Sequence, residues 1–442
     1  MNIREFSDRV LAAAKAAGIA PAEISYSSSA SFSARARLGE LENYQVSDRI
    51  GLALRGMVNG RIGTASTQAI DEDSIDLLVR GVMESAELIE TDEQDEILPP
   101  DDHYETVVNM KPELENVTAE EKIALAMELD KLVSQADSRI TPEHSVVASG
   151  SETFCLRNSL GLDLTHSSNM IYAYTGAMAK EDGRTATAMK LLWGYGLEDV
   201  DAKTIADGAV EEALMKVNAG RMKSGAYPVV IKNSAMADLL STFSGVFSAD
   251  NAQKGLSLLG ERVGETIASP LVTLTDDPLM PMGLGSCPFD REGAATYTKN
   301  VIENGVLTTL LHNRKTAKKA GVKTTGNAAG AGRVAPSNLY IAPGEMTCEE
   351  LLAQMGDGLY LTEVSGLHAG ANPVSGDFSL LSRGFEVRGG KCVRAVEQFT
   401  VAGNFYKLLE SIEAVGSDLL FEGSPIGSPC VRVKSLSVAG EN

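Results

Sequence analysis

Residues 366–380 read GLHAGANPVSGDFSL and form the most informative stretch of this 442-residue chain. Its Asn-Pro and Ser-Gly-Asp sequences are turn formers, because Asn, Ser and Asp side chains hydrogen-bond to nearby backbone groups. One interpretation is a structural loop that orients the strand after it. The other is the wall of a peptide-binding groove, where an extended peptide adds to a sheet edge. In that case the side chains facing the peptide are His368, Asn372, Ser375 and Asp377.

Hairpin signals continue on both sides of this stretch. Residues 303–305 (ENG) and 388–391 (RGGK) each stand between β-forming residues, and residues 430–438 alternate as a half-buried strand does. We therefore expect residues 221–442 to form a β-rich, sandwich-like or barrel-like domain.

A buried helix is predicted at the start of this domain. Asn233 or Ser234 can cap it, and the following apolar residues recur every three or four positions. Such a wide stripe indicates a core helix, and the chain as a whole is predicted to be of the α+β class. The stripe consists of Met236, Leu239, Leu240, Phe243, Val246 and Phe247.

Four stretches in the same order resemble the PmbA/TldE branch of the TldD/PmbA family, which pairs a zinc peptidase with a relative lacking the zinc. They are residues 251–255 (NAQKG), 301–307 (VIENGVL), 336–344 (PSNLYIAPG) and 366–380. The resemblance is specific from about residue 225 to the end, whereas the first 220 residues match the family only in general layout.

The resemblance also identifies where a zinc site would lie. In the TldD branch the core helix carries His-Glu-x-x-x-His, with a further cysteine ligand near the C-terminus. Aligned on Lys254 and Gly255, those three positions fall on Leu240, Ser241 and Gly245 in this chain. Cys430 follows the aligned Ser-Pro instead of standing upstream of it. The resemblance therefore implies that this chain has lost every metal ligand and binds no cofactor.

The distribution of histidine and cysteine supports the same expectation. A catalytic zinc usually has two ligands close together on one element. The five histidines are never closer than His144 and His166, and no Cys-x-x-Cys occurs. Ligands converging from distant segments remain an alternative, for instance His312, His368 and Cys392. The glycine-rich run at residues 324–333 lacks the strand, helix and Gly-Lys-Ser/Thr context of a nucleotide-binding loop.

The first 220 residues are predicted to consist of two α/β segments, 1–105 and 106–220, each with two helices on a sheet, and the two sheets could be one. Helices are expected at about 3–17, from 73 or 74, after a capping box at residues 118–121, and at 201–218. Asn59-Gly60 predicts a type I′ hairpin. The stripe of the third helix is predicted to be Leu125, Leu129 and Leu132. The acidic residues 90–96 are interpreted as a surface linker, with an acidic binding tail as the alternative.

Composition limits the classes of function. The formal net charge is −21, from 60 acidic and 39 basic residues, and this opposes direct binding to nucleic acid. No apolar run approaches the roughly 20 residues that span a bilayer, and no secretory signal opens the chain. Five cysteines without a pattern fit a reducing compartment. We therefore expect a cytoplasmic protein without membrane contact.

The resemblance implies a non-catalytic partner of a TldD-like zinc peptidase, in a heterodimer that cleaves unstructured peptides during peptide maturation and antitoxin turnover. Zinc is then expected only in the TldD-like partner. Self-association of the isolated chain stays open, as does the question of whether it is an enzyme. The alternatives are an active metallopeptidase with unrecognised ligands and a non-enzymatic regulator of DNA gyrase.

Overall fold

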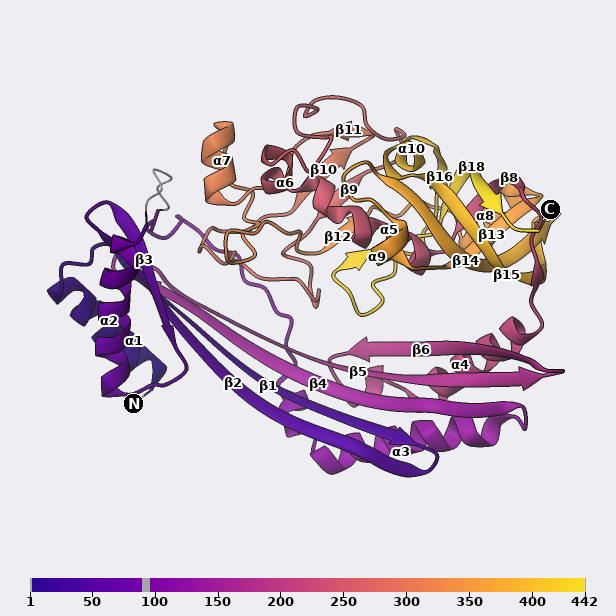
Figure 1. Cartoon of the computed structure of the whole chain (residues 1–442), viewed down its shortest axis with the longest axis horizontal. Helices are drawn as coiled ribbons and strands as arrows, with labels where there is room; N and C mark the ends of the chain where they lie inside the picture. The colour runs from indigo at the N-terminus through magenta and orange to yellow at the C-terminus, as the bar shows by residue number, and fades with distance from the viewer. Residues whose placement is uncertain (1, 90–95, 442) are drawn as a thin grey trace.

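The structure is a computed structural model that describes residues 2–89 and 96–441, so the acidic run at 90–96 lies outside the described residues apart from Glu96. One antiparallel sheet dominates the N-terminal half, with the strand order β3-β2-β1-β4-β5-β6 (Figure 1). Its strands are β1 (Ala22–Arg37), β2 (Glu40–Val58), β3 (Arg61–Thr67), β4 (Ile140–Asn158), β5 (Asp163–Glu181) and β6 (Arg184–Gly194).

The two N-terminal segments share this sheet, because β1 pairs with β2 along one edge and with β4 along the other. Ser28, for example, lies opposite both Ile50 and Thr153. The predicted hairpin between β2 and β3 is confirmed. Asn59 and Gly60 both have positive φ angles, of 50° and 81°, as a type I′ turn requires.

Four helices cover the sheet, and each begins with a side-chain cap. Figure 1 shows α3 and α4 on the convex side of the curved sheet, and α1 and α2 at its other end. The caps are Asn2, Asp71, Thr118 with the predicted capping box, and Asp201. The helices are α1 (Ile3–Ala16), α2 (Glu72–Glu87), α3 (Ala119–Ala136) and α4 (Ala202–Val217).

Two details of these helices differ from the prediction. Helix α2 starts at Glu72, before residue 73, because the Asp71 carboxylate accepts a hydrogen bond from the Ser74 amide. In α3 only Leu129 of the predicted stripe is fully buried, and Leu125 and Leu132 are half-buried. The buried face is turned by one position, so that the small side chain of Ala126 lies against the sheet.

A closed five-stranded barrel forms the centre of the C-terminal half. Each strand pairs with the next, and the first and last also pair, so the barrel has no open edge. The predicted barrel-like domain is thus confirmed. In order around the ring, the strands are β8 (Gly225–Ile231), β13 (Gly358–Ser365), β14 (Asp377–Arg388), β15 (Lys391–Asn404) and β18 (Val431–Ala439).

Shorter elements surround the barrel. Strands β7 (Gly220–Arg221) and β16 (Ile412–Val415) extend its sheet. A second sheet has the order β11-β10-β9-β12-β17, with the strands β9 (Leu274–Asp276), β10 (Lys299–Glu303), β11 (Val306–Leu307), β12 (Leu339–Ile341) and β17 (Ile426–Gly427). The remaining helices are α5 (Asn233–Phe243), α6 (Ala249–Gln253), α7 (Arg314–Ala320), α8 (Cys348–Met355), α9 (Leu367–Gly370) and α10 (Phe405–Glu410).

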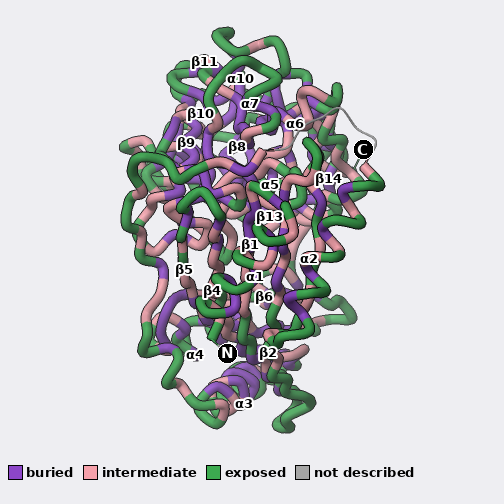
Figure 2. Tube along the Cα trace, turned by 90° about the vertical axis from the view of Figure 1, so that its left-hand side faces the viewer, coloured by how far each residue is buried: buried purple, intermediate pink, exposed green. Residues whose placement is uncertain are grey.

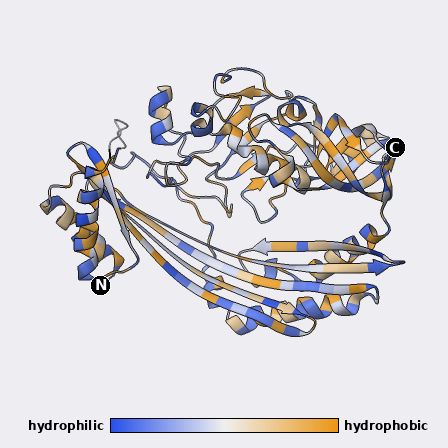
Figure 3. Ribbon diagram, in the orientation of Figure 1, coloured by the Kyte–Doolittle hydropathy of each residue, from blue (hydrophilic) through white to orange (hydrophobic). Residues whose placement is uncertain are grey.

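Helix α5 is the predicted core helix. Hydrophobic residues are dense in and around the barrel (Figure 3), and buried residues gather inside a shell of exposed loops (Figure 2). The predicted cap was wrong: the helix begins at Asn233, whose side-chain amide donates to Asp418 instead. The predicted stripe also continues past the α-helix, since Val246 and Phe247 lie in a 3-10 turn, Ser244–Phe247.

The C-terminal half lies over the concave side of the large sheet (Figure 1). Trp193 of β6 donates to the Phe421 carbonyl at 2.7 Å, and the Tyr195 hydroxyl donates to the Met282 carbonyl at 2.7 Å. Burial raises the pKa of Tyr195 to about 12. None of the helices in residues 2–89 and 96–441 combines the length and hydrophobicity of a membrane span.

Candidate functional site

The three positions that the family resemblance aligns with two zinc-binding histidines and a glutamate base lie on α5 and the turn after it. Leu240 is 0% exposed and belongs to the main C-terminal core with Met236 and Phe243. Ser241 faces outward, and its carbonyl accepts a hydrogen bond from the Ser244 hydroxyl at 2.8 Å. The structure therefore places Leu240 in the core, as the predicted apolar stripe indicates.

Gly245, at the third aligned position, takes part in a local hydrogen bond through its backbone. Its carbonyl accepts a hydrogen bond from the Asn251 side-chain amide at 2.9 Å. A Cβ atom added to Gly245 would lie 3.1 Å from that same nitrogen. A leucine, a serine and a glycine offer neither the imidazoles nor the carboxylate base of a zinc peptidase. These residues do not fit a catalytic zinc.

The segment 366–377 lies beside α5. It contains α9, which contacts α5, and it leads into β14 of the barrel. The Asn372 side-chain carbonyl accepts from the amides of Val374 and Ser375, at 3.0 and 3.2 Å. The Ser375 hydroxyl donates to the Asp377 carboxylate at 2.9 Å. Three of the four predicted groove residues thus bind their own loop.

A second strand fixes the loop from outside. The Asn404 side-chain amide donates to the Asp377 carboxylate and to the Ser375 carbonyl, both at 2.8 Å. These contacts hold the pKa of Asp377 below its ordinary value, with the Asn404 hydrogen bond as the larger cause and the Ser375 hydroxyl next. His368 is exposed on α9, as Asn372 and Asp377 are in the loop. Of the four residues, His368 alone takes no part in these hydrogen bonds.

Aromatic packing joins the loop to α5. The Phe243 ring, at the end of α5, stacks on Phe405 with centroids 4.7 Å apart. It also packs against Phe378, directly after the loop, at 6.3 Å. Aromatic packing therefore joins segments that are more than 100 residues apart in sequence.

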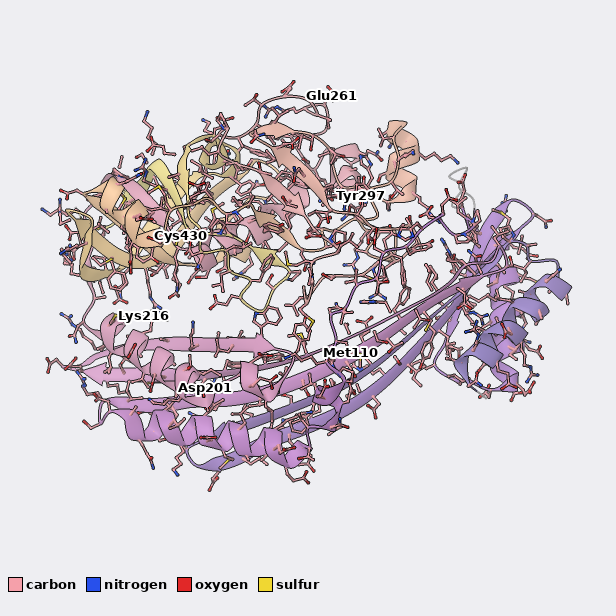
Figure 4. The ribbon with its side chains drawn as sticks, turned by 180° about the vertical axis from the view of Figure 1, so that it is seen from behind. Met110, Asp201, Lys216, Glu261, Tyr297 and Cys430 are labelled. Atoms are coloured by element: carbon pink, nitrogen blue, oxygen red, sulfur yellow. The ribbon has the colours of Figure 1, made fainter. Side chains whose placement is uncertain are left out.

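Asp238 is a site residue that sequence reasoning missed. It lies on the exposed side of α5, one turn before Ser241. Partial burial of its carboxyl, together with the nearby carboxylates of Glu422 and Glu363, raises the pKa of Asp238 to about 6. Figure 4 shows Lys216 at the end of α4, and its Nζ lies 2.7 Å from Glu363. No sequence pattern places Glu363 and Glu422 near this helix.

In the part of the chain that the structure describes, one group of side chains brings together atoms that could ligate a metal. Cys348, Asp418 and Cys430 bring their ligand atoms within 4.8 Å of one another. His312, His368 and Cys392 are not brought together, so that alternative set is wrong for the described residues. His312 is instead buried in the core beside Thr316.

Two of the clefts in the described part of the chain lie between the large sheet and the C-terminal half. The larger, about 1060 Å³, is lined by Arg55, Lys318 and Lys319, and by Gly330–Gly332 of the glycine-rich run. The smaller, about 340 Å³, is lined by His166 and Cys287 among others. Burial raises the pKa of Cys287 to about 11, so its thiol is a poor nucleophile at neutral pH. Neither cleft is lined by residues of the 366–377 loop.

Three domain models of one protein family match successive parts of this architecture. The PmbA/TldA metallopeptidase domain 1 matches residues 22–86, the central domain matches 112–217, and the C-terminal domain matches 224–440. The chain belongs to the PmbA/TldD metallopeptidase family. The resemblance drawn from the four stretches is thereby confirmed, and it extends over the first 220 residues as well.

Individual relatives cover nearly the whole chain. Metalloprotease PmbA of Escherichia coli O157:H7 is 26% identical over 427 residues, covering 95% of this chain and 92% of the relative. A solved structure of a proposed modulator of a DNA gyrase from Thermotoga maritima MSB8 has a TM-score of 0.93 at 33% identity, covering 99% of this chain and all of that one. TldE from Thermococcus kodakarensis shares the fold, with a TM-score of 0.90 at 21% identity over 98% of this chain and all of that one.

Proposed function

We propose that this chain is the metal-free member of a two-protein metallopeptidase, in which a TldD-like partner carries the zinc and the two together cleave unstructured peptides. The family membership supports a role in peptide hydrolysis. The residues on α5 support a role without zinc, and the burial of Leu240 carries that argument.

Leu240 lies in the hydrophobic core, so restoring a zinc-binding histidine at this position would also destabilise the fold. Its side chain is fully buried beside the stacked Phe243 ring. A histidine there would have to keep a polar ring in an apolar core without a hydrogen-bond partner, at a cost of about 1–3 kcal/mol. The helix now stabilises the domain at the position where a peptidase would hold its metal.

Substrate selection would follow from enclosure. A chamber formed by two subunits admits an extended peptide and excludes a folded domain, because only the former is narrow enough. The loop 366–377 is held rigidly beside α5, so it can serve as a fixed wall of that chamber. His368 is then the loop residue best placed to meet a peptide, since it is exposed and takes no part in the hydrogen bonds that hold Asn372, Ser375 and Asp377.

Complex formation with the partner tests the proposal first. Size-exclusion chromatography with light scattering should show a one-to-one complex with the TldD-like protein, and elemental analysis should find about one zinc per complex. All of that zinc should be traceable to the partner. About one zinc per chain in this protein alone would instead support an active metallopeptidase with other ligands.

Loop variants test the groove separately from the fold. His368→Ala should lower joint peptide cleavage without changing the melting temperature, because His368 is exposed. Asp377→Asn should lower both, since Asp377 holds the loop through Asn404 and Ser375. Unchanged cleavage in His368→Ala would remove that residue from the groove. Binding to the TldD-like partner without any effect on peptide cleavage would instead favour the alternative function, a non-enzymatic regulator of DNA gyrase.

A further inference from the structure

Two cysteines meet on the outer side of the barrel. Cys348 is the first residue of α8, and Cys430 directly precedes β18. They are separated by 82 positions in sequence, yet their Sγ atoms lie 2.8 Å apart. Figure 4 labels Cys430 among the strands of the C-terminal half. No spacing pattern in the sequence predicts this pair.

The two thiols differ in access. Cys430 is 1% exposed and belongs to a small apolar cluster with Val230, Leu351 and Val387. Cys348 is half-buried at the edge of that cluster, and the Tyr360 hydroxyl lies 3.6 Å from its sulfur. A small solute can therefore reach Cys348 more easily than Cys430.

Asp418 completes the group. Its carboxylate accepts a hydrogen bond from the Cys430 amide at 2.9 Å and another from the Asn233 side chain at 3.1 Å. Both sulfurs lie within 4.8 Å of a carboxylate oxygen of Asp418. A base thus stands beside the thiol pair, and it is connected to the first residue of α5.

The spacing of the sulfurs distinguishes between a metal site and a redox pair. Two thiolates on one tetrahedral zinc, with bonds of about 2.3 Å, stand about 3.7 Å apart. The observed 2.8 Å is too short for that arrangement. A disulfide bond of about 2.05 Å requires the two sulfurs to approach by less than 1 Å from where they stand.

We propose that Cys348 and Cys430 are a reversible thiol-oxidation site, which forms an intramolecular disulfide in the presence of a peroxide. In the first step the Cys348 sulfur attacks one oxygen of hydrogen peroxide, the O–O bond breaks, and a sulfenic acid and water form. In the second step the Cys430 sulfur attacks the sulfenic sulfur, and a second water leaves as the S–S bond forms. Two thiols are oxidised and one peroxide is reduced to two waters.

The electrostatics assign these roles in the same order. Cys348 is the more accessible thiol, and the hydrogen bond from Cys430 lowers its pKa, so both its exposure and its pKa favour it as the attacking thiol. The pKa of Cys430 is raised, first by its hydrogen bond to Cys348 and then by burial. In the second step the Asp418 carboxylate is positioned to receive the Cys430 proton.

Mass spectrometry tests the proposal on the full-length reduced protein. Addition of hydrogen peroxide should yield a non-reduced tryptic peptide linking Cys348 to Cys430, with a loss of two of the five titratable thiols. Dithiothreitol should restore both thiols, and prior treatment with a chelator should change nothing. The disulfide should raise the melting temperature by several degrees, because it closes a long loop.

Matched variants decide among the cysteines. Cys392→Ser should leave the linked peptide unchanged, because Cys392 is exposed on β15 outside the pair. Cys348→Ser should abolish the link. In Cys430→Ala, which keeps a small apolar residue in the cluster, a sulfenic-acid probe should label Cys348. A disulfide that includes Cys392, protection of both thiols by bound zinc, or over-oxidation of Cys348 in the unmutated protein would each overturn the proposal.

Discussion

Replacement of Leu240 by alanine should destabilise the C-terminal half, because Leu240 belongs to its main hydrophobic core. The side chain is 0% exposed, and it lies one turn before Phe243, on the same face of the helix. Because the Phe243 ring is held at 4.7 Å against Phe405, the surroundings cannot easily collapse into the space left behind.

The size of the effect follows from that rigidity. Leucine-to-alanine changes in protein cores cost about 2–5 kcal/mol, and the loss is largest where the cavity stays open. We expect Leu240→Ala to cost about 3–5 kcal/mol of the free energy of unfolding. Leu240→Met, which conserves volume, should cost less than about 1.5 kcal/mol. Ser241→Ala, on the exposed side of the same helix, should stay within about 0.5 kcal/mol.

Urea unfolding followed by far-UV circular dichroism measures these differences, and amide exchange in α5 assigns the loss to this helix. The cost is the change in midpoint multiplied by the slope of free energy against urea concentration, provided the slope is shared by the variants. A Leu240→Ala cost below about 1 kcal/mol would show that Leu240 contributes little to the core. That result would contradict the view that a core residue has replaced a zinc ligand at this position.

Three further predictions concern metal, pH and the loop. Elemental analysis of the purified chain should find no stoichiometric transition metal, and Leu240→His should destabilise it without creating chelator-sensitive peptidase activity; a stable zinc-dependent variant would contradict this. The Asp238 pKa of about 6 lies above its ordinary value of 3.8, so the folded state binds that proton more tightly and the protein should lose stability as pH rises from about 4 to 7. Asp238→Asn should remove about 1 kcal/mol of that loss, a figure reduced for solvent screening at an exposed residue, and an unchanged pH profile of unfolding would refute the assignment. Asn404→Ala, which removes the hydrogen bonds to Asp377 and Ser375, should lower the melting temperature and speed proteolysis of the loop, whereas the exposed Lys391→Ala should do neither.

Much of the fold could be predicted because local rules decide it. Asn59-Gly60 and the capping box at Thr118 act within a few residues, and the structure contains both as expected. The core stripe of α5 was predictable for the same reason, since every third or fourth residue is apolar. Its true start was not, because Asn233 is drawn away from capping by Asp418, 185 positions later.

The candidate site was predictable only where it depends on a few neighbouring residues. The self-bonded loop around Asn372 and Asp377 follows from turn chemistry, and the structure shows those hydrogen bonds. The acidic surroundings of Asp238 and the contact between Cys348 and Cys430 depend on how distant strands close the barrel. Nothing in the spacing of those residues along the chain encodes that closure.

The most direct measurement is hydrolysis of an unstructured peptide by this chain alone, by the TldD-like partner alone, and by the two mixed. We expect this chain alone to leave the peptide intact and the mixture to cleave it faster than the partner does, with all activity lost on chelation. A matched mixture containing His368→Ala should cleave more slowly at the same extent of complex formation. Chelator-sensitive cleavage by this chain alone, or no gain on mixing, would contradict the proposal that it is the metal-free half of a shared peptidase.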